Sequence, residues 1–462
     1  MAATDLAVIG AGPAGLSAAV TAARAGAQVT VVDECPEPGG QYLRGSPRQS
    51  VSRYVSQSAR RAQTLLEEMR FLHVDFRAET LAWALEGTGL ALAGPSGSEW
   101  LEARAVVIAV GGREVVLPFP GWTLPGVMTL GGAQILAKAH GVLPGKRILL
   151  AGSGPLLLAA ADELSRHGAQ VLAVLEATHP LAWLRHGMAA WGNWDRLREG
   201  WAYLISLKKR GIPYQFGRTV SGVSGREQVE AATVVRLNQQ GIPLPASEER
   251  LAADAVCVGF GFIPNIELTQ LAGCEHEYDP LKGGWVPAVD ETMETSIPGL
   301  FAAGETAGIC GAEAAMLEGR VAGLAAALRL GLVRSGSVDR TLADLKRARR
   351  RAQRFGAMLN TLFQAGPCLD ALTTDDTILC RCEDVAAGQL RAAVRGGIHS
   401  LDALKIATRA GQGACQGRTC GLLIARLIAE QTGSSLSTVK GFHVRPPLKP
   451  VPLGVLAQER HP

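Results

Sequence analysis

Four cysteines near the carboxyl terminus are spaced as ligands of a soft metal centre. Cys380 and Cys382 form a C-x-C pair, and Cys415 and Cys420 form a C-x-x-x-x-C pair around the residues QGRT. Thiolates in this number bind zinc or iron–sulfur centres. Structural zinc more often uses C-x-x-C pairs, so this spacing beside nucleotide-binding motifs favours a 2Fe-2S cluster, with zinc as the alternative.

A second group of residues, near the amino terminus, could bind a dinucleotide. Gly10, Gly12 and Gly15 follow a short apolar run in G-x-G-x-x-G spacing and open an Ala-rich stretch of good helix propensity. Gly12 lets backbone approach a pyrophosphate, and Gly15 lets the helix pack closely on its strand. The next strand ends at Asp33, where a carboxylate can accept both ribose hydroxyls. The alternative is an ordinary glycine-rich turn.

Further candidate contacts with this dinucleotide lie at neighbouring turns and strand ends. Gly40 allows close approach of backbone, and Gln41 offers an amide to a flavin ring or phosphate, although a simple Pro-Gly turn would look the same. The acid Glu305 ends a later strand and could instead be a helix-start acid favoured by the helix dipole. The remaining candidates are Pro13, Ala14, Glu34, Leu81, Gly111 and Gly304.

A second βαβ unit begins at Lys146, and its glycine motif is incomplete. Gly152 and Gly154 keep the first two glycine positions, but Leu157 stands at the third, where its side chain should hold the helix away from the strand. Glu176 ends the following strand in the place of a ribose carboxylate. We expect a second Rossmann domain, whose site could hold NAD, ATP or another adenine nucleotide, or no nucleotide.

These motifs require an α/β architecture with several domains. At 462 residues, the chain is long enough for two to four domains. We expect two Rossmann-like dinucleotide-binding domains and a small helical domain, whose cysteine segments CRCEDV and GACQGRTC resemble the bacterioferritin-associated-ferredoxin type of 2Fe-2S domain. The predicted boundaries are 1–115 with 285–332 for a split FAD-binding domain, 116–284 for the inserted NAD-like domain, 333–374 for a basic helical linker, 375–433 for the 2Fe-2S domain and 434–462 for a Pro-rich tail.

Charge and hydropathy limit the environment of the protein. The first strand begins within about five residues, which leaves no room for a signal peptide, and no apolar run reaches membrane-spanning length. We expect a cytoplasmic protein that could reach the inner membrane only through partners. Lys and Arg outnumber Asp and Glu by 19 to 10 from Gly331 onward. The run 346–354 predicts a solvated helix face that could dock on an acidic partner, and we expect no nucleic-acid binding.

Several local expectations follow from the same patterns. Helices are predicted at 50–69, at 311–331, at 386–395 and at 401–409 with Ser400 as its cap, and Cys420 should lie near the start of another helix. The tail 445–457 should be extended, without a regular helix. Four tryptophans between residues 183 and 203 predict either core packing or an exposed patch for a partner subunit.

Together, these segments resemble the larger, two-nucleotide-domain subunit of heteromeric bacterial flavin dehydrogenases. This family includes subunits of hydrogen cyanide synthase, of octopine and nopaline (opine) oxidases and of D-hydroxyproline dehydrogenase. The resemblance covers most of the chain and rests on VIGAGPAGLSAA, DECPEPGGQ, GGREVVLPFPGWTLPGV, AGSGPLLL, VGFGFIPN, GAEAAMLEGRVAGLAAA, CRCEDV and GACQGRTC. The departures are Glu305, where aspartate is usual, and Val110, where a small or hydroxylated residue is expected.

The resemblance implies that amino-acid or imino-acid oxidation occurs in a separate, D-amino-acid-oxidase-like FAD subunit, in some members with FMN between the subunits and a small ferredoxin-like subunit. This chain would then pass electrons from its FAD through the cluster to an acceptor protein or a quinone. No acid–base constellation for amine oxidation stands out, so we name no catalytic residue. The alternatives are a stand-alone NAD(P)H-dependent reductase of a small electron carrier and a non-catalytic scaffold.

Overall fold

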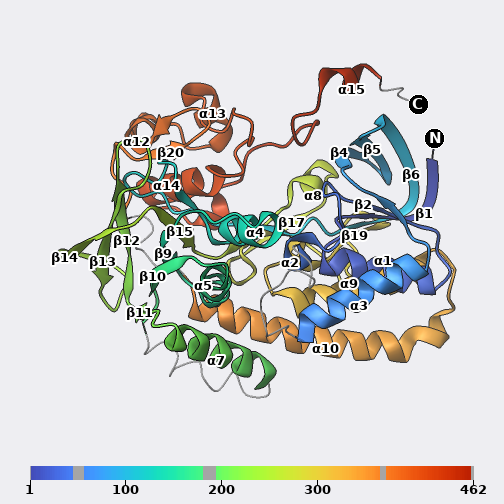
Figure 1. The fold of residues 1–462 in the computed structure, drawn as a ribbon. Coiled ribbons are helices and arrows are strands. Elements are labelled where there is room, and N and C mark those ends of the chain that lie inside the picture. Colours follow the sequence, from blue (N-terminus) through green and yellow to red (C-terminus); the bar gives the residue numbers. More distant parts are fainter. Residues whose placement is uncertain (1, 45–56, 180–193, 365–370, 459–462) are drawn as a thin grey trace.

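The computed structural model describes residues 2–44, 57–179, 194–364 and 371–458. These residues form a mixed α/β structure with two largely parallel sheets, each covered by helices, and a small helical unit formed by residues from 378 onward (Figure 1). The prediction of a Rossmann-like α/β fold is confirmed. Within the described residues, no helix is both long and apolar enough to cross a membrane.

The first sheet carries the amino-terminal glycine motif. Its spatial order is β3 (Asp75–Arg77), β2 (Val29–Val32), β1 (Ala2–Ile9), β6 (Gly97–Ile108), β5 (Gly89–Gly94) and β4 (Leu81–Glu86), with β19 (Leu300–Ala302) also paired with β6. The strands β1, β2, β3, β6 and β19 run parallel, and the β4–β5–β6 meander is antiparallel. Strand β19 therefore completes a sheet that begins at the amino terminus.

Helices α1 (Pro13–Arg24), α3 (Gln57–Phe71) and α9 (Ala312–Arg329) pack on this sheet, and α2 (Gly40–Leu43) lies beside the glycine motif. Helix α9 crosses α1 at very short distance, since a Cβ added to Gly319 would lie 2.0 Å from the carbonyl oxygen of Ala14. The predicted helix 311–331 is confirmed as α9. The predicted helix 50–69 corresponds to α3, and its first residues lie outside the described ranges.

The second sheet has five parallel strands in the order β11 (Tyr214–Phe216), β10 (Gln170–Glu176), β9 (Arg147–Gly152), β15 (Ala255–Gly259) and β8 (Val127–Thr129). It packs with α4 (Leu130–His140), α5 (Leu156–Arg166) and α7 (Trp194–Lys209). Leu157 is fully buried between α5 and the sheet. A three-stranded antiparallel sheet, β12 (Arg218–Ser224), β13 (Ala231–Leu237) and β14 (Pro243–Ala252), lies at one end.

Short elements connect the two sheets. They are the pair β7 (Gly112–Glu114) with β16 (Phe262–Pro264), the pair β17 (His276–Asp279) with β18 (Gly284–Pro287), and α8 (Glu267–Leu271). The long helix α10 (Ser335–Leu362) follows α9, runs beneath the first sheet and α9 in Figure 1, and ends beside the glycine turn of the second sheet. Its basic run 346–354 presents a solvated face, as predicted, with Arg347, Arg350, Arg351 and Arg354 exposed. Arg349 lies off that face: it is 6% exposed and donates hydrogen bonds to the Met293 sulfur and the Glu291 carbonyl.

The cysteine-rich unit comprises β20 (Ile378–Cys380), β21 (Val385–Ala386), α12 (Ala387–Arg395), α13 (Leu401–Thr408) and α14 (Gly421–Thr432). The helices match the predicted ones: the Ser400 hydroxyl accepts from the Ala403 amide at 3.3 Å, and Cys420 is the N-cap of α14. Between residues 439 and 452 the tail has no regular element, and it bends at 446–449 rather than running straight. The prediction that it contains no helix is wrong, because α15 (Leu453–Ala457) begins directly after Pro452, which is its N-cap.

Candidate functional site

The glycine turn before α1 leaves open space at the end of the helix. The N-cap of α1 is Gly12, which has no side chain to accept a hydrogen bond. The first backbone amides of the helix are therefore not capped by a side chain. A Cβ added to Gly12 would meet no protein atom within 4 Å, whereas one added to Gly15 would lie 1.8 Å from the Gly10 carbonyl oxygen. Gly40 approaches the Cα of Gly12 from α2. This geometry fits a pyrophosphate between the helix and the turn.

The acids at the end of β2 hold two different positions. Asp33 accepts hydrogen bonds from the amides of Ala11 at 2.6 Å and Cys35 at 2.8 Å, so it lies against the glycine turn. Glu34 points outward and pairs with Lys449 of the tail at 2.5 Å. Leu81 opens β4 close by, since the Thr80 amide donates to the Asp33 carbonyl at 2.9 Å. Asp33, Glu34 and Leu81 therefore border one region next to the glycine turn.

A second cluster of candidates lies where β6 and β19 end. Gly111 adopts a positive φ and donates its amide to the Thr306 hydroxyl at 3.1 Å. The Gly304 amide donates to the Glu318 carboxylate at 2.9 Å, and a Cβ at Gly304 would lie 2.7 Å from the Cβ of Ala14. Burial raises the pKa of Glu305, which also accepts from the Gly112 backbone. Gly111, Gly304 and Glu305 thus meet near the start of α1, where a flavin dinucleotide would continue.

The glycine turn of the second sheet is arranged differently. Glu176 is fully buried, and its carboxylate accepts from the amides of Gly154 and Thr178, the Thr178 hydroxyl and the Tyr214 hydroxyl, all at 3.0–3.1 Å. Burial raises its pKa. The Ser153 hydroxyl donates to the Phe363 carbonyl of α10's C-cap at 2.8 Å. In this conformation Glu176 binds protein groups, so a role in ribose binding by Gly152, Gly154 and Glu176 stays a prediction.

A cavity of about 1190 Å³ extends from the glycine turn of the second sheet to Glu305, at the end of the first sheet. Its wall includes Glu305, which follows β19 of the first sheet, Gly154 from the glycine turn of the second sheet, and Cys310, whose pKa burial raises to about 12. Side chains from α3, α7, α10 and α14 complete the wall, and several of them are arginines: Arg60, Arg61, Arg196, Arg198, Arg351 and Arg426. The wall also carries Glu114, Glu199, Glu305 and Glu313, and Glu313 pairs with both Arg61 and Arg196, so the cavity is lined by charges of both signs.

The four predicted metal ligands meet in two pairs of thiols. Cys382 is hydrogen-bonded to Cys415, and Cys420 to Cys380. Burial raises the pKa of Cys415, but hydrogen bonds from Thr419, Cys382 and Gly417 together bring it below the usual value. Cys380 and Cys420 are each 1% exposed, whereas Cys382 is exposed. Four paired thiols are a donor set suited to an iron–sulfur centre. Among the described residues, no group of three or more His, Cys, Asp and Glu is arranged around a single metal position.

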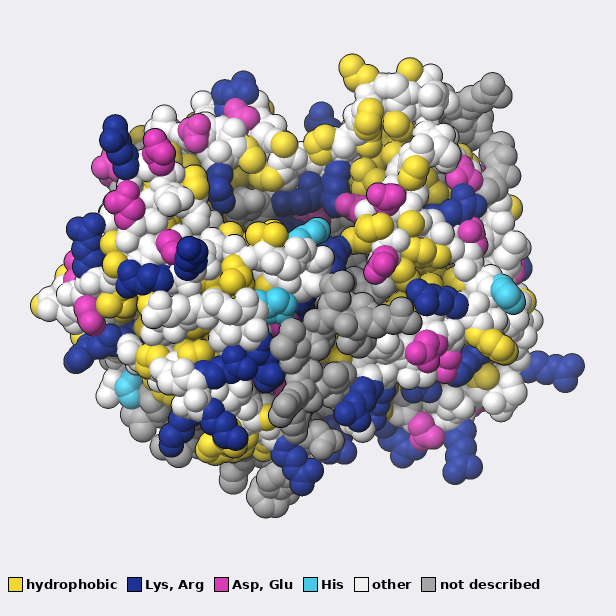
Figure 2. Space-filling view, in the orientation of Figure 1, with side chains coloured by type: hydrophobic (Ala, Val, Ile, Leu, Met, Phe, Trp, Pro, Cys, Tyr) yellow, Lys and Arg dark blue, Asp and Glu magenta, His cyan; other side chains and the backbone are white. Residues whose placement is uncertain are grey.

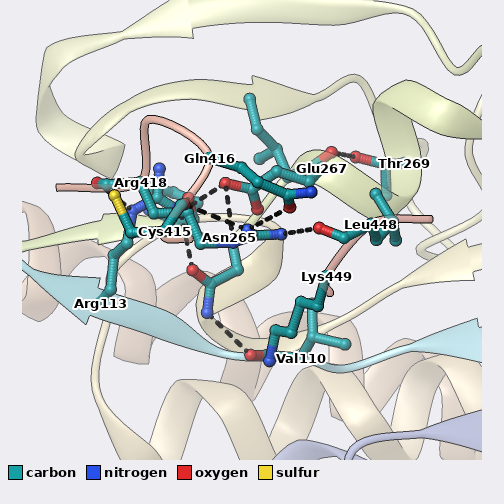
Figure 3. Close-up of polar contacts among 12 residues, drawn as sticks. Val110, Arg113, Asn265, Glu267, Thr269, Cys415, Gln416, Arg418, Leu448 and Lys449 are labelled. Atoms are coloured by element: carbon teal, nitrogen blue, oxygen red, sulfur yellow. Dashed lines mark hydrogen bonds and ion pairs between the residues drawn. The ribbon is translucent and has the colours of Figure 1, made fainter. Parts of the chain in front are cut away.

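The loop between Cys415 and Cys420 is hydrogen-bonded to the side of the molecule that carries the candidate flavin contacts (Figure 3). The guanidinium of Arg113, on β7, donates to the Arg418 carbonyl at 3.1 Å, to Asn265 at 2.8 Å and to Glu267 at 2.8 Å. Asn265 in turn donates to the Val110 carbonyl at 3.0 Å. Arg113 directly follows Gly111 and Gly112, so this network ties the cysteine loop to the candidate flavin contacts.

The other cysteines make no disulfide in the described part of the chain. Cys35, Cys257, Cys274 and Cys310 are free, and Cys368 lies outside the described residues.

Two of the tryptophans in the segment 183–203, Trp183 and Trp191, also lie outside the described residues. Trp201 on α7 is 66% exposed and Ile205, one turn later, is 50% exposed, so these two do not pack in the core. Of the two predictions for the tryptophan-rich segment, core packing and an exposed patch, Trp201 therefore fits the exposed patch.

Sequence reasoning missed Arg113, Asn265, Glu318 and Lys449. Arg113 and Asn265 belong to segments that carried the resemblance, GGREVVLPFPGWTLPGV and VGFGFIPN, but their pairing depends on strands β7 and β16 meeting. Lys449 stands alone in a proline-rich tail, and no local pattern connects it with Glu34. Only Glu318, an acid in an otherwise Ala-rich helix, gave a signal that could have been noticed.

The fold and the first glycine turn define a flavin-dependent oxidoreductase. Residues 4–331 match the family model described as pyridine nucleotide-disulphide oxidoreductase, and residues 375–460 match the sarcosine oxidase A3 domain. The crystal structure of L-proline dehydrogenase from P. horikoshii is similar, with a TM-score of 0.71 and 22% identity over 99% of this chain and 80% of that one. At this identity, the likeness supports the fold alone.

Two relatives identify the particular family. The A-type subunit of an opine oxidase from Rhizobium meliloti is 35% identical, with 99% of this chain and 88% of the relative covered. The HcnB subunit of hydrogen cyanide synthase from Pseudomonas aeruginosa is 33% identical, with 96% of each covered. The chain therefore belongs to the family of A-type subunits of heteromeric flavin dehydrogenases, as its motifs predicted.

Proposed function

We propose that this chain is the electron-transfer subunit of a heteromeric FAD-dependent dehydrogenase that acts on the CH–NH bond of amino or imino acids, of the opine or D-hydroxyproline type. FAD at the first glycine turn would pass electrons to a 2Fe-2S cluster on Cys380, Cys382, Cys415 and Cys420 and then to an acceptor protein or quinone. A D-amino-acid-oxidase-like FAD subunit would oxidise the substrate, and FMN at the subunit boundary fits the arginine-lined cavity.

One observation carries this proposal: Arg113, next to Gly111 and Gly112, is hydrogen-bonded to the backbone of the cysteine loop. Bound FAD would supply both two-electron and one-electron transfer, so it could take an electron pair from a donor and release the electrons one at a time to an iron–sulfur cluster, which accepts them singly. The protein must therefore hold the two sites in fixed proximity. Gly12 and the start of α1 would hold the pyrophosphate, and Arg113 and Glu267 would fix the cysteine loop.

The second candidate function is a stand-alone NAD(P)H-dependent reductase of a small electron carrier. It is favoured by the cavity that joins Gly154 to Glu305, because a nicotinamide could reach the flavin through it. It is disfavoured by the state of Glu176, since this carboxylate is buried and accepts four hydrogen bonds from protein groups instead of facing a ribose. A non-catalytic scaffold would instead bind a flavin that cannot be reduced.

An anaerobic titration of the purified chain, followed by visible absorption and EPR, separates these functions. NADH is added first and dithionite second. We expect flavin absorption and a rhombic reduced 2Fe-2S signal that appears with dithionite and not with NADH. Rapid bleaching by NADH would make the chain a reductase, and absence of iron would overturn the cluster. Bleaching by an amino or imino acid is expected only once the partner subunit is added.

A further inference from the structure

The tail segment 447–449 contacts two distant parts of the molecule at once. The Leu448 amide donates to the Trp83 carbonyl of β4 at 2.9 Å, while its own carbonyl accepts from the Arg418 guanidinium of the cysteine loop at 2.7 Å. The carbonyl of the preceding Pro447 accepts from the Gln416 side-chain amide at 3.4 Å. Consecutive backbone groups of the tail therefore link the flavin-binding sheet to the cysteine loop.

The side chains of the same segment are also fixed. Leu448 is 7% exposed and belongs to a core cluster that includes Ile9 and Val32, the last residues of β1 and β2. Lys449 pairs with both carboxylate oxygens of Glu34 at 2.5 Å. A terminal segment with one buried side chain, one ion pair and three backbone hydrogen bonds is held in place, because each contact restricts a different group.

The place where this segment attaches is the adenosine end of the candidate flavin site. Strands β1 and β2 end at the glycine turn and at Asp33, and β4 begins at Leu81. Leu448 belongs to the core cluster that contains the last residues of β1 and β2, and Lys449 pairs with Glu34, the acid directly after Asp33. In Figure 2, the surface is hollowed between the cysteine-rich unit and the β4–β6 side, where Lys and Arg side chains gather. In Figure 3, Lys449 lies below the Arg418 network, next to Leu448.

We propose that residues 447–449 are a carboxyl-terminal strap that closes the adenosine end of the FAD site, with Lys449 as an additional residue of that site. Lys449 offsets the negative charge that Glu34, Asp33 and a pyrophosphate would otherwise concentrate there. The strap also fixes Arg418, so retention of the flavin and the position of the cysteine loop depend on the same three residues. This inference rests on the proposed binding of FAD at the first glycine turn.

The test measures release of FAD from the purified full-length chain, followed by the fluorescence of the freed flavin after dilution. The variants are Lys449→Ala, Lys449→Arg and a chain that ends at Arg445. Arg445→Ala is the matched control, because Arg445 is exposed and lies four residues away. We expect release to be roughly fivefold faster in Lys449→Ala, the order for loss of a half-exposed ion pair, and wild-type in Lys449→Arg and Arg445→Ala. The shortened chain, which also loses the Leu448 contacts, should release FAD more than about tenfold faster.

The outcomes separate this inference from the proposed function. If the wild-type chain binds no FAD, the flavin assignment itself fails. If the wild-type chain binds FAD and both Lys449→Ala and the shortened chain release it at the wild-type rate, the strap is overturned while the flavin assignment stands. If the shortened chain does not fold, as judged by circular dichroism, the comparison of Lys449→Ala with Arg445→Ala decides alone.

Discussion

The Nε atom of Arg113 lies 3.1 Å from the backbone carbonyl oxygen of Arg418, although the two residues are 305 positions apart in the chain. This hydrogen bond, with those to Asn265 and Glu267, joins the strand after the candidate flavin contacts to the loop between the second pair of cysteines. The contact uses a backbone acceptor, so it depends on the position of the loop rather than on the identity of residue 418.

Replacement of Arg113 by alanine should remove the hydrogen bonds that hold the cysteine loop against β7. We expect the free energy of unfolding to fall by about 1–3 kcal/mol, because Glu267 and the Arg418 carbonyl lose a partly buried charged partner. Urea denaturation measures the change, and the EPR line shape reports on the cluster. Arg347→Ala is the control: the Arg347 side chain is 76% exposed and forms a surface ion pair with Asp344, so its loss should cost less than about 0.5 kcal/mol. Equal effects of the two substitutions would contradict the role of Arg113.

Two glycines of the first turn should respond differently to alanine. Gly12→Ala should leave the stability of the apoprotein within about 0.5 kcal/mol, because the added methyl group meets no protein atom, yet weaken FAD binding more than about tenfold by occupying the space for the pyrophosphate. Gly15→Ala should destabilise the fold by about 1–3 kcal/mol or more, since its Cβ would overlap the Gly10 carbonyl. Thermal unfolding and flavin titration measure both effects. Wild-type FAD affinity in Gly12→Ala would place the cofactor elsewhere.

Serine at any of Cys380, Cys382, Cys415 and Cys420 should remove or greatly reduce the bound iron and sulfide, because each would contribute one thiolate. Chemical analysis and visible absorption give the result without an activity assay. Cys274→Ser is a suitable control, since Cys274 is buried outside this group and its sulfur lies 3.5 Å from the Thr295 hydroxyl, which a serine could also contact. Retention of full iron and sulfide by all four variants would exclude these residues as ligands.

Glu318 should make stability depend on pH near neutrality. Burial raises the pKa of its carboxyl to about 7, against 4.5 in the unfolded chain, so the folded protein binds the extra proton between these values. Stability from this group is complete below pH 4.5 and is lost as the pH rises toward 7, by at most about 1.4 kcal/mol per pH unit. In Glu318→Gln, this part of the pH dependence should disappear from urea-denaturation curves recorded between about pH 5 and 8. An unchanged slope would mean that other groups cause it.

The sequence was most informative where chemistry is local. The glycine motif, the Ala-rich helix after it and the Ser400 cap each depend on a few neighbouring residues, and the structure contains all three elements. Cys420 at the start of α14 follows from the same logic, since an apolar periodic stretch begins directly after it.

Features that depend on tertiary contacts were not predictable in the same way. Arg349 reads as one of many solvated arginines, but α10 turns that position toward Met293 and buries it. The sequence did not predict the helix α15, because the prolines before it indicated an extended tail without a helix. Glu176 ends its strand as a ribose-binding acid would, yet its carboxylate accepts hydrogen bonds from the hydroxyls of Tyr214 and Thr178. Each of these outcomes depends on a partner that is distant in sequence or unmarked by any motif.

The late arrival of β19 has a consequence for synthesis of the chain. Residues Val106–Ile108 of β6 pair with β1 on one side and with Leu300–Ala302 on the other. Until the ribosome has made residue 302, that second side offers unpaired backbone groups on a wholly apolar segment, and such edges template aggregation. The inserted second sheet is complete by residue 259, so it can fold first and keep the growing chain soluble while the amino-terminal sheet waits for its last strand. Nascent chains stalled between residues 108 and 259, where neither sheet is complete, should be the ones that most need chaperones.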